Sequence, residues 1–237
     1  MIKKTLRNRR RLRFETLEER RLLATYVVSN TADSGTGSLR QAILDSNASP
    51  ARDTIAFSIA SISKSIEAKS SLPPITDPVT IDATTQPGYA GTPIVELSGK
   101  QLSNGEYGLF LKAGLSEVRG LVINQFPGFG IHIEGPGQNR IESNYVGTDL
   151  SGQIAKGNGL SGIQVLDSDN NRIGGPGVGN LTSGNGWDGV RIWGSLSHSN
   201  WIQGNRIGTD ANGLSAVPNL LVGLVLAGSS TMSANAT

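Results

Sequence analysis

The sequence predicts an all-β protein, a right-handed parallel β-helix with an N-terminal strand–helix–strand cap. The phrase NRIESNYVGTDLSG at residues 139–152 returns as NWIQGNRIGTDANG at residues 200–213. Asn139 thus recurs as Asn200 and Gly162 as Gly223, each 61 residues further along. The chain has 31 glycines, 5% aromatic residues and no cysteine, a composition that favours short strands and turns. A repeat without insertions is typical of a stacked structural unit.

The N-terminal head, residues 1–25, differs in charge from the rest of the chain. Residues 1–21 contain nine of the 21 Lys and Arg and three of the 19 Asp and Glu, which leaves 12 basic and 16 acidic side chains. This distribution argues against nucleic-acid binding by the folded part. The head is expected to be a disordered, solvated tail or an address segment. Its apolar stretch is too short to span a membrane.

The stretch RFETLEERRLLA, residues 13–24, resembles the LEPR-XLL type of N-terminal signature of surface or secreted proteins from planctomycete-like bacteria. Glu19 stands where the usual form has Pro. The resemblance implies export and an extracellular or cell-surface location, and it implies nothing about chemistry. The matching residues are Phe14, Glu15, Leu17, Glu18, Arg20, Leu22, Leu23 and Ala24.

Residues 26–60 are expected to form the cap. Two strand-like segments, 26–28 and 53–57, flank a glycine turn and a short helix that Ser38 can cap. An amphipathic helix can cover the core that the first coil of a solenoid would otherwise expose. The segment resembles the DSGxGSLRQAI…DTIxF opening of bacterial β-helix surface proteins, including relatives of polymorphic outer-membrane proteins. The apolar helix face would consist of Leu39, Ala42 and Ile43.

Residues 61–228 are expected to form stacked coils, roughly five of them from Val79 onward. One strand motif recurs as GLFL, GIHI, GIQV, GVRI and GLVL, and a second as NRI, NRI and NWI. Because side chains alternate across a strand, the Ile, Leu and Val of each motif would form columns, stacked about 4.8 Å apart in one core. At the corners, Asn tolerates left-handed backbone and can stack in hydrogen-bonded ladders. The expected corner residues are Asn139, Asn171 and Asn200.

An antiparallel sandwich or barrel is the alternative fold, but it needs turns at a regular spacing of about 8–12 residues. The long GTDLSGQIAKGNGLS connector fits that spacing poorly. The GNxIGTD phrases resemble the same β-helix surface proteins, which are related to the pectate-lyase-like class. Residues 229–237 are expected to be disordered. The chain would then be a fragment of a longer protein, or it would associate end to end through an uncapped C-terminal coil.

The body offers no evident catalytic constellation. Polysaccharide hydrolases use paired carboxylates, and the close pair in the body is Asp167 and Asp169. This pair could contribute oxygen ligands to calcium, but a polar corner turn is strongly favoured, because Asx-rich turns need no metal. No metal and no cofactor are expected. Four further polar residues are interpreted as repeat elements or isolated surface residues: Asp149, Asp210, His132 and His198.

Alternation predicts aromatic and basic side chains on the outer surface of one flank. Flat indole rings stack on sugars or pack in interfaces, so the flank is a candidate glycan- or partner-binding strip unless a neighbouring loop shields it. Its residues are Trp193, Trp201, Arg191, Arg172 and Arg140, with Trp187 close by.

The sequence therefore favours a non-enzymatic, exported cell-surface β-helix module with a structural or adhesive role, in contact with polysaccharide or other cell-surface components. The alternative is a polysaccharide lyase or glycoside hydrolase of the pectate-lyase-like class, or a degenerate remnant of one.

Overall fold

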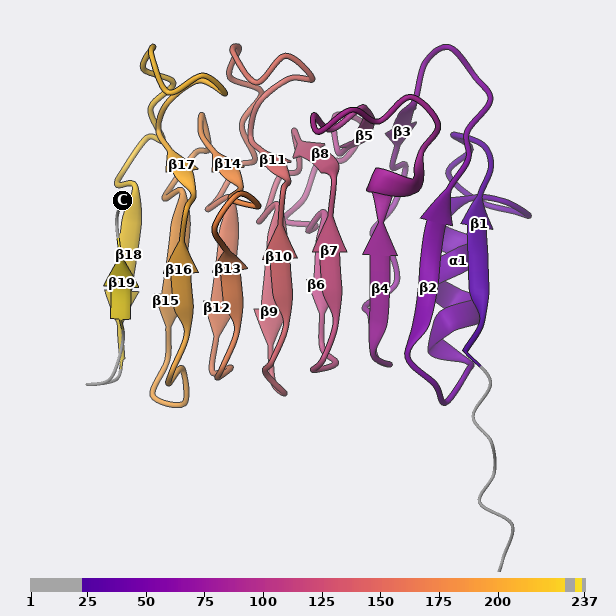
Figure 1. Cartoon of the computed structure of the whole chain (residues 1–237), viewed down its shortest axis with the longest axis horizontal. Coiled ribbons are helices and arrows are strands. Elements are labelled where there is room, and N and C mark those ends of the chain that lie inside the picture. Colours follow the sequence, from indigo (N-terminus) through magenta and orange to yellow (C-terminus); the bar gives the residue numbers. More distant parts are fainter. Residues whose placement is uncertain (1–22, 229–232, 236–237) are drawn as a thin grey trace, which may run out of the picture.

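The computed structural model describes residues 23–228 and 233–235. Most of the expected export signature, Phe14 to Leu22, and residues 229–232 and 236–237 lie outside the described residues. Within the described part, the chain forms three sheets in which every pair of neighbouring strands is parallel (Figure 1). Because each coil contributes successive strands to these sheets, the molecule is the predicted parallel β-helix.

Sheet A faces the viewer in Figure 1, and its strands follow one another along the helix axis. They are β1 (Thr25–Val28), β2 (Asp53–Phe57), β4 (Val79–Asp82), β7 (Glu117–Arg119), β10 (Arg140–Glu142), β13 (Arg172–Gly174), β16 (Trp201–Gln203) and β19 (Ser233–Asn235). The short 3-10 helix η1 (Ala83–Thr85) follows β4. Strand β19 pairs with β16, so the structure differs at Ser233–Asn235 from the disorder expected there.

Sheets B and C complete each coil. Sheet B contains β3 (Ser65–Glu67), β5 (Val95–Ser98), β8 (Leu121–Asn124), β11 (Tyr145–Val146), β14 (Leu181–Thr182) and β17 (Arg206–Ile207). Sheet C contains β6 (Leu109–Leu111), β9 (Ile131–Glu134), β12 (Ile163–Leu166), β15 (Val190–Trp193) and β18 (Leu224–Ala227).

The register of the strands explains the repeated apolar motifs. In sheet C, Ile131, Ile163 and Val190 stand in one column, and all three are fully buried. In sheet A, Ile141 and Ile173 form the corresponding column. Stacking thus joins residues from separate coils into one core, which no single coil could bury alone.

The N-terminal end carries the expected cap. The side chain of Ser38 accepts a hydrogen bond from the Gln41 backbone N–H and starts α1 (Leu39–Asn47). The helix packs against β1 and β2 (Figure 1) and buries its apolar face. Arg40 pairs with Asp33 at 2.8 Å and also donates to two carbonyl groups at residues 70 and 71, so these charges hold the cap onto the first coil.

Asparagine ladders fix the corners of the coils. Asn139 donates both its backbone N–H and its side-chain amide to Oδ1 of Asn171, which donates in the same way to Asn200. This confirms the predicted ladder. The left-handed backbone, however, belongs to the residue before each asparagine. These residues are Gln138 (φ 65°), Asn170 (φ 54°) and Ser199 (φ 50°). The preceding residue makes the bend, so the asparagine side chain is free to turn inward.

Two further ladders with the same hydrogen-bond pattern lie at other corners. Asn144, Asn180 and Asn205 form one, and Asn158, Asn185 and Asn219 form the other. In all three ladders the donor belongs to the earlier coil and the acceptor oxygen to the later one. The ladders therefore have a direction along the axis.

The repeated GTD phrases build two equivalent loops. Each loop begins and ends at an antiparallel bridge, Thr148 with Ala155 and Thr209 with Ala216. Both loops project from the same side of the β-helix, the upper side in Figure 1. Among the described residues, no helix has the length and apolar character needed to cross a bilayer.

Candidate ligand-binding face

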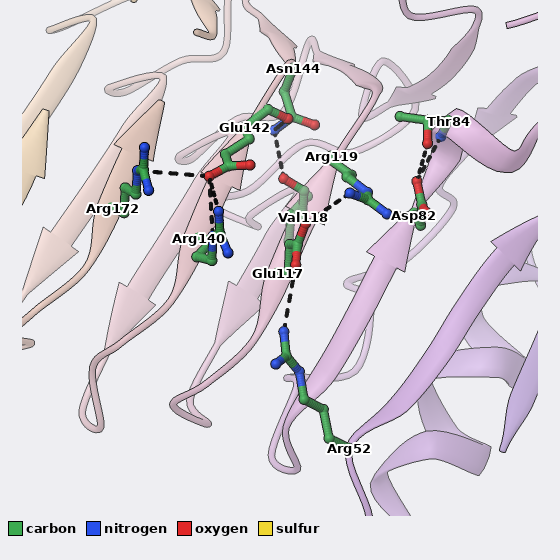
Figure 2. Close-up of polar contacts among 10 residues, drawn as sticks. All are labelled: Arg52, Asp82, Thr84, Glu117, Val118, Arg119, Arg140, Glu142, Asn144 and Arg172. Atoms are coloured by element: carbon green, nitrogen blue, oxygen red, sulfur yellow. Dashed lines mark hydrogen bonds and ion pairs between the residues drawn. The ribbon is translucent and has the colours of Figure 1, made fainter. Parts of the chain in front are cut away.

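The outer surface of sheet A carries two columns of polar side chains, because alternate residues of each strand point away from the core. One column runs through Glu117, Arg140, Arg172 and Trp201, in register across β7, β10, β13 and β16. The other runs through Asp82, Arg119 and Glu142. Figure 2 shows the charged members of both columns on neighbouring strands.

Arg119 joins two carboxylates at the N-terminal end of this face. Its guanidinium lies 2.6 Å from Asp82 and 3.3 Å from Glu117. Glu117 also lies 3.6 Å from Arg52 (Figure 2). Each carboxylate here is paired with a cation from another strand or loop, so this part of the face links adjacent coils.

The C-terminal part of the face has an excess of cations. Glu142 lies 3.0 Å from the guanidinium of Arg140 and 3.9 Å from that of Arg172 (Figure 2). Glu142 is buried, whereas the side chains of Arg140 and Arg172 are 48% and 41% exposed. One carboxylate thus serves two arginines, and the positive charge faces solvent.

Trp201 lies beside this positive charge. It is paired in register with Arg172 and is 59% exposed. Alternation explains the position, since Ile202 points into the core and its neighbour must point outward. An exposed indole next to an exposed guanidinium can bind a ligand with a flat apolar surface and an anionic group.

Asp82 is held in its ionised form. Burial raises the pKa of this carboxyl, but hydrogen bonds from Arg119 and Thr84 outweigh burial, and the pKa lies below its usual value. The same pair raises the pKa of Arg119, mainly through the hydrogen bond to Asp82. Neither group is suited to proton transfer near neutral pH, since general acids and bases work best with a pKa near the operating pH.

The predicted strip is divided between two sheets. Arg191 and Trp193 lie on β15 of sheet C, whereas Arg140, Arg172 and Trp201 lie on sheet A. The Arg191 guanidinium stacks over the Trp193 ring at 4.6 Å and pairs with Asp188 at 3.0 Å. Arg191 is therefore satisfied within the protein, and the sheet A residues are the more accessible group.

His132 is not the surface residue expected from the sequence. It is 4% exposed, and its ring stacks on Phe129 at a centroid distance of 5.2 Å and lies 5.0 Å from Tyr107. Burial lowers its pKa, although Glu134 opposes this shift. The outward side of β9 is thus covered by aromatic residues from neighbouring loops. His198 is exposed, as expected.

The carboxylate pair considered for calcium and the aspartates of the repeated loops all make turn contacts. Asp167 accepts from the Leu196 N–H at 3.1 Å, and Asp169 from the Asn170 side chain at 2.7 Å. Asp149 and Asp210 accept backbone N–H groups within the two repeated loops. Among the described residues, no three His, Cys, Asp or Glu side chains are grouped so that they could hold a metal ion.

Sequence reasoning missed the charged pairs of sheet A. Asp82, Arg119, Glu117 and Glu142 were not predicted as neighbours, because Asp82 and Arg119 are 37 residues apart. A signal was present in the sequence, since EVR and RIE place charges on both sides of the inward Val118 and Ile141. Alignment of the EVR and RIE motifs with the NRI motif would have placed these charged residues on neighbouring strands.

Comparison with solved structures finds a similarity to an alginate lyase from Paenibacillus sp. str. FPU-7. The two chains are 14% identical, the match covers 77% of this chain and 75% of that chain, and the TM-score is 0.35. At that score the similarity carries no argument about function. No protein family and no curated protein matches the sequence.

Proposed function

We propose that this protein is an exported, non-catalytic β-helix module that binds an acidic polysaccharide on the outer face of sheet A. The observation that carries the proposal is the exposed pair formed by Trp201 and Arg172, with Arg140 in the same column. The indole would stack on a sugar ring, and the two arginines would bind carboxylate or sulfate groups.

The geometry of the column suits a linear polymer. Successive strands of a sheet are about 4.8 Å apart, so Trp201, Arg172 and Arg140 present one side chain per coil along the helix axis. A chain of sugars lying along this axis would meet a new side chain at each step. This arrangement favours an extended ligand over a small molecule.

The alternative function is a polysaccharide lyase or hydrolase, or a remnant of one. Cleavage would require a group that can transfer a proton. On sheet A the carboxylates contact arginines, and the pKa of Asp82 is lowered. These contacts favour binding over turnover.

Binding should be measured by isothermal titration of polygalacturonate and alginate, with a fully methyl-esterified pectin as the uncharged comparison. We expect Trp201→Ala to weaken binding of both acidic polymers about tenfold, the loss of one good stacking contact. Arg172→Ala should remove much of the preference for the acidic polymers over the ester, and added salt should do the same. Each variant must keep the melting temperature of the parent protein.

Trp193→Ala is the matched control, because Trp193 is also exposed but lies on sheet C. It should bind as the parent does. Weaker binding in Trp193→Ala with unchanged binding in Trp201→Ala would move the site to sheet C and overturn the proposal. Release of unsaturated or reducing sugars from either polymer would establish an enzyme instead.

Export to the cell surface is proposed from the resemblance of residues 13–24 to the LEPR-XLL signature. We expect deletion of residues 13–24 to retain the protein inside cells of a planctomycete-like host, while the full chain reaches the surface or the medium. Fractionation followed by immunoblotting measures this. Equal distribution of the two forms would contradict the proposal.

A further inference from the structure

Four asparagines of the chain are followed directly by glycine, and the structure separates them into two pairs. Asn158 and Asn185 belong to an asparagine ladder and are 1% exposed. Asn104 and Asn212 lie in exposed loops. Asparagine is chemically labile, and glycine has no side chain to shield its backbone nitrogen. That nitrogen can attack the side-chain amide of the preceding asparagine, provided that both groups are free to meet.

In the buried pair, both reacting groups are engaged in hydrogen bonds. Nδ2 of Asn158 donates to Oδ1 of Asn185 at 3.0 Å. The N–H of Gly159 donates to the carbonyl oxygen of Phe126, and the N–H of Gly186 to that of Asn158, each at 2.7 Å. Attack at either position would therefore require the coil to open.

The two exposed asparagines differ in the state of the glycine that follows. The N–H of Gly213, next to Asn212, donates to the carbonyl oxygen of Asp210 at 3.0 Å. At Asn104, neither the side-chain amide nor the N–H of Gly105 has a hydrogen-bond partner among the described residues. A Cβ at Gly105 would meet nothing within 4 Å, so the backbone here has room to move. Of the four Asn–Gly pairs, which all lie within the described residues, Asn104–Gly105 alone leaves both groups free.

We propose that Asn104 is a site of spontaneous deamidation, and that its conversion to isoaspartate loosens the loop that covers His132. The nitrogen of Gly105 attacks Cγ of Asn104 and loses its proton to solvent, while Nδ2 takes up a proton and leaves as ammonia. The new N–Cγ bond closes a five-membered succinimide ring. Water then breaks either this bond, which gives aspartate, or the original peptide bond, which gives isoaspartate. Nothing is oxidised or reduced, and the inference is independent of the proposed polysaccharide binding.

Isoaspartate would disturb the loop because Asn104 holds it through backbone groups. The Asn104 N–H donates to Oε2 of Glu106 at 3.0 Å, and its carbonyl oxygen accepts from the Glu106 N–H. The Glu106 carbonyl oxygen accepts from the Gly128 N–H at 2.9 Å. Tyr107, the next residue, lies against His132 at a centroid distance of 5.0 Å. Isoaspartate adds one carbon atom to the backbone between these contacts, so they cannot all keep their geometry.

Peptide mapping by mass spectrometry, after incubation of the whole protein in mildly alkaline buffer, measures the conversion. Asn104 should convert about fivefold faster than Asn212, which one hydrogen bond protects. Asn158 and Asn185 should remain unconverted in the folded protein. In concentrated urea all four should convert at similar rates, because the fold alone distinguishes them. Gly105→Ala should slow the conversion of Asn104 at least about tenfold, since the methyl group shields the nitrogen and restricts the backbone.

Diethyl pyrocarbonate, which acylates accessible histidines, reports the state of the loop. His198 is exposed and serves as the internal reference, whereas His132 is buried. In the isoaspartate form, which anion exchange separates by its added negative charge, His132 should react at least about tenfold faster than in the parent. Asn104→Asp is the matched control, because it adds the charge without lengthening the backbone. In this variant His132 should react as slowly as in the parent.

The outcomes separate the two parts of the proposal. The site is wrong if Asn104 converts no faster than Asn212 or the buried pair in the folded protein, or if Gly105→Ala leaves its rate unchanged. The effect on the loop is wrong if His132 reacts equally in the parent and the isoaspartate form, or equally in that form and Asn104→Asp.

Discussion

Asn171→Ala is expected to lower the free energy of unfolding by about 3 kcal/mol. Asn171 is fully buried in the middle of its ladder. Its Oδ1 accepts from the backbone N–H of Asn139 at 3.0 Å and from the side-chain amide of Asn139 at 2.9 Å. The alanine leaves both donors of Asn139 buried without this acceptor, and an unsatisfied buried polar group costs about 1–3 kcal/mol.

Urea unfolding followed by tryptophan fluorescence measures this change, because Trp187, Trp193 and Trp201 lie in the adjacent coil. Asn212→Ala is the matched control, since Asn212 is exposed in a repeated loop. It should change the stability by less than about 0.5 kcal/mol. A loss below about 1 kcal/mol for Asn171→Ala would mean that packing, and not the ladder, holds the corner.

The ladder also shows what the sequence could and could not predict. The first ladder and the apolar columns were predicted, because strand alternation and recurring glycines are local signals. The ladders through Asn180 and Asn185 were not, because the 61-residue repeat spans two coils and these residues occupy the intermediate coil. Their neighbours in the ladder become visible only when the register of each sheet is known.

The candidate site was predicted in part for a similar reason. Alternation correctly placed Trp193 and Trp201 at the surface, and the two strand motifs already separated their strands, but the motifs did not show that these strands belong to sheets on different faces. The two tryptophans therefore belong to different faces. Burial of His132 depends on Tyr107 and Phe129, which lie outside its own strand. Contacts made by connecting loops have no periodic signal in a sequence.

Gly137→Ala is expected to lower the free energy of unfolding by about 3 kcal/mol or more, through steric overlap between coils. A Cβ atom at Gly137 would lie 1.6 Å from the carbonyl oxygen of Asp169 in the next coil. That oxygen accepts from the Gln138 N–H at 3.0 Å, so the coils cannot separate locally without loss of this bond. The strand spacing of a sheet is nearly fixed, and the backbone has little freedom to adapt.

For a chain of this size, such a loss corresponds to a fall in melting temperature of roughly 6–12 °C, measured by circular dichroism. Gly105→Ala is the control, because a Cβ there would meet nothing within 4 Å, and it should leave the melting temperature nearly unchanged. If Gly137→Ala has the same melting temperature as Gly105→Ala, the coils at this corner must be further apart than the structure places them. The ladder from Asn139 to Asn171, two residues away, would then be weakened as well, and the Asn171→Ala effect would shrink with it.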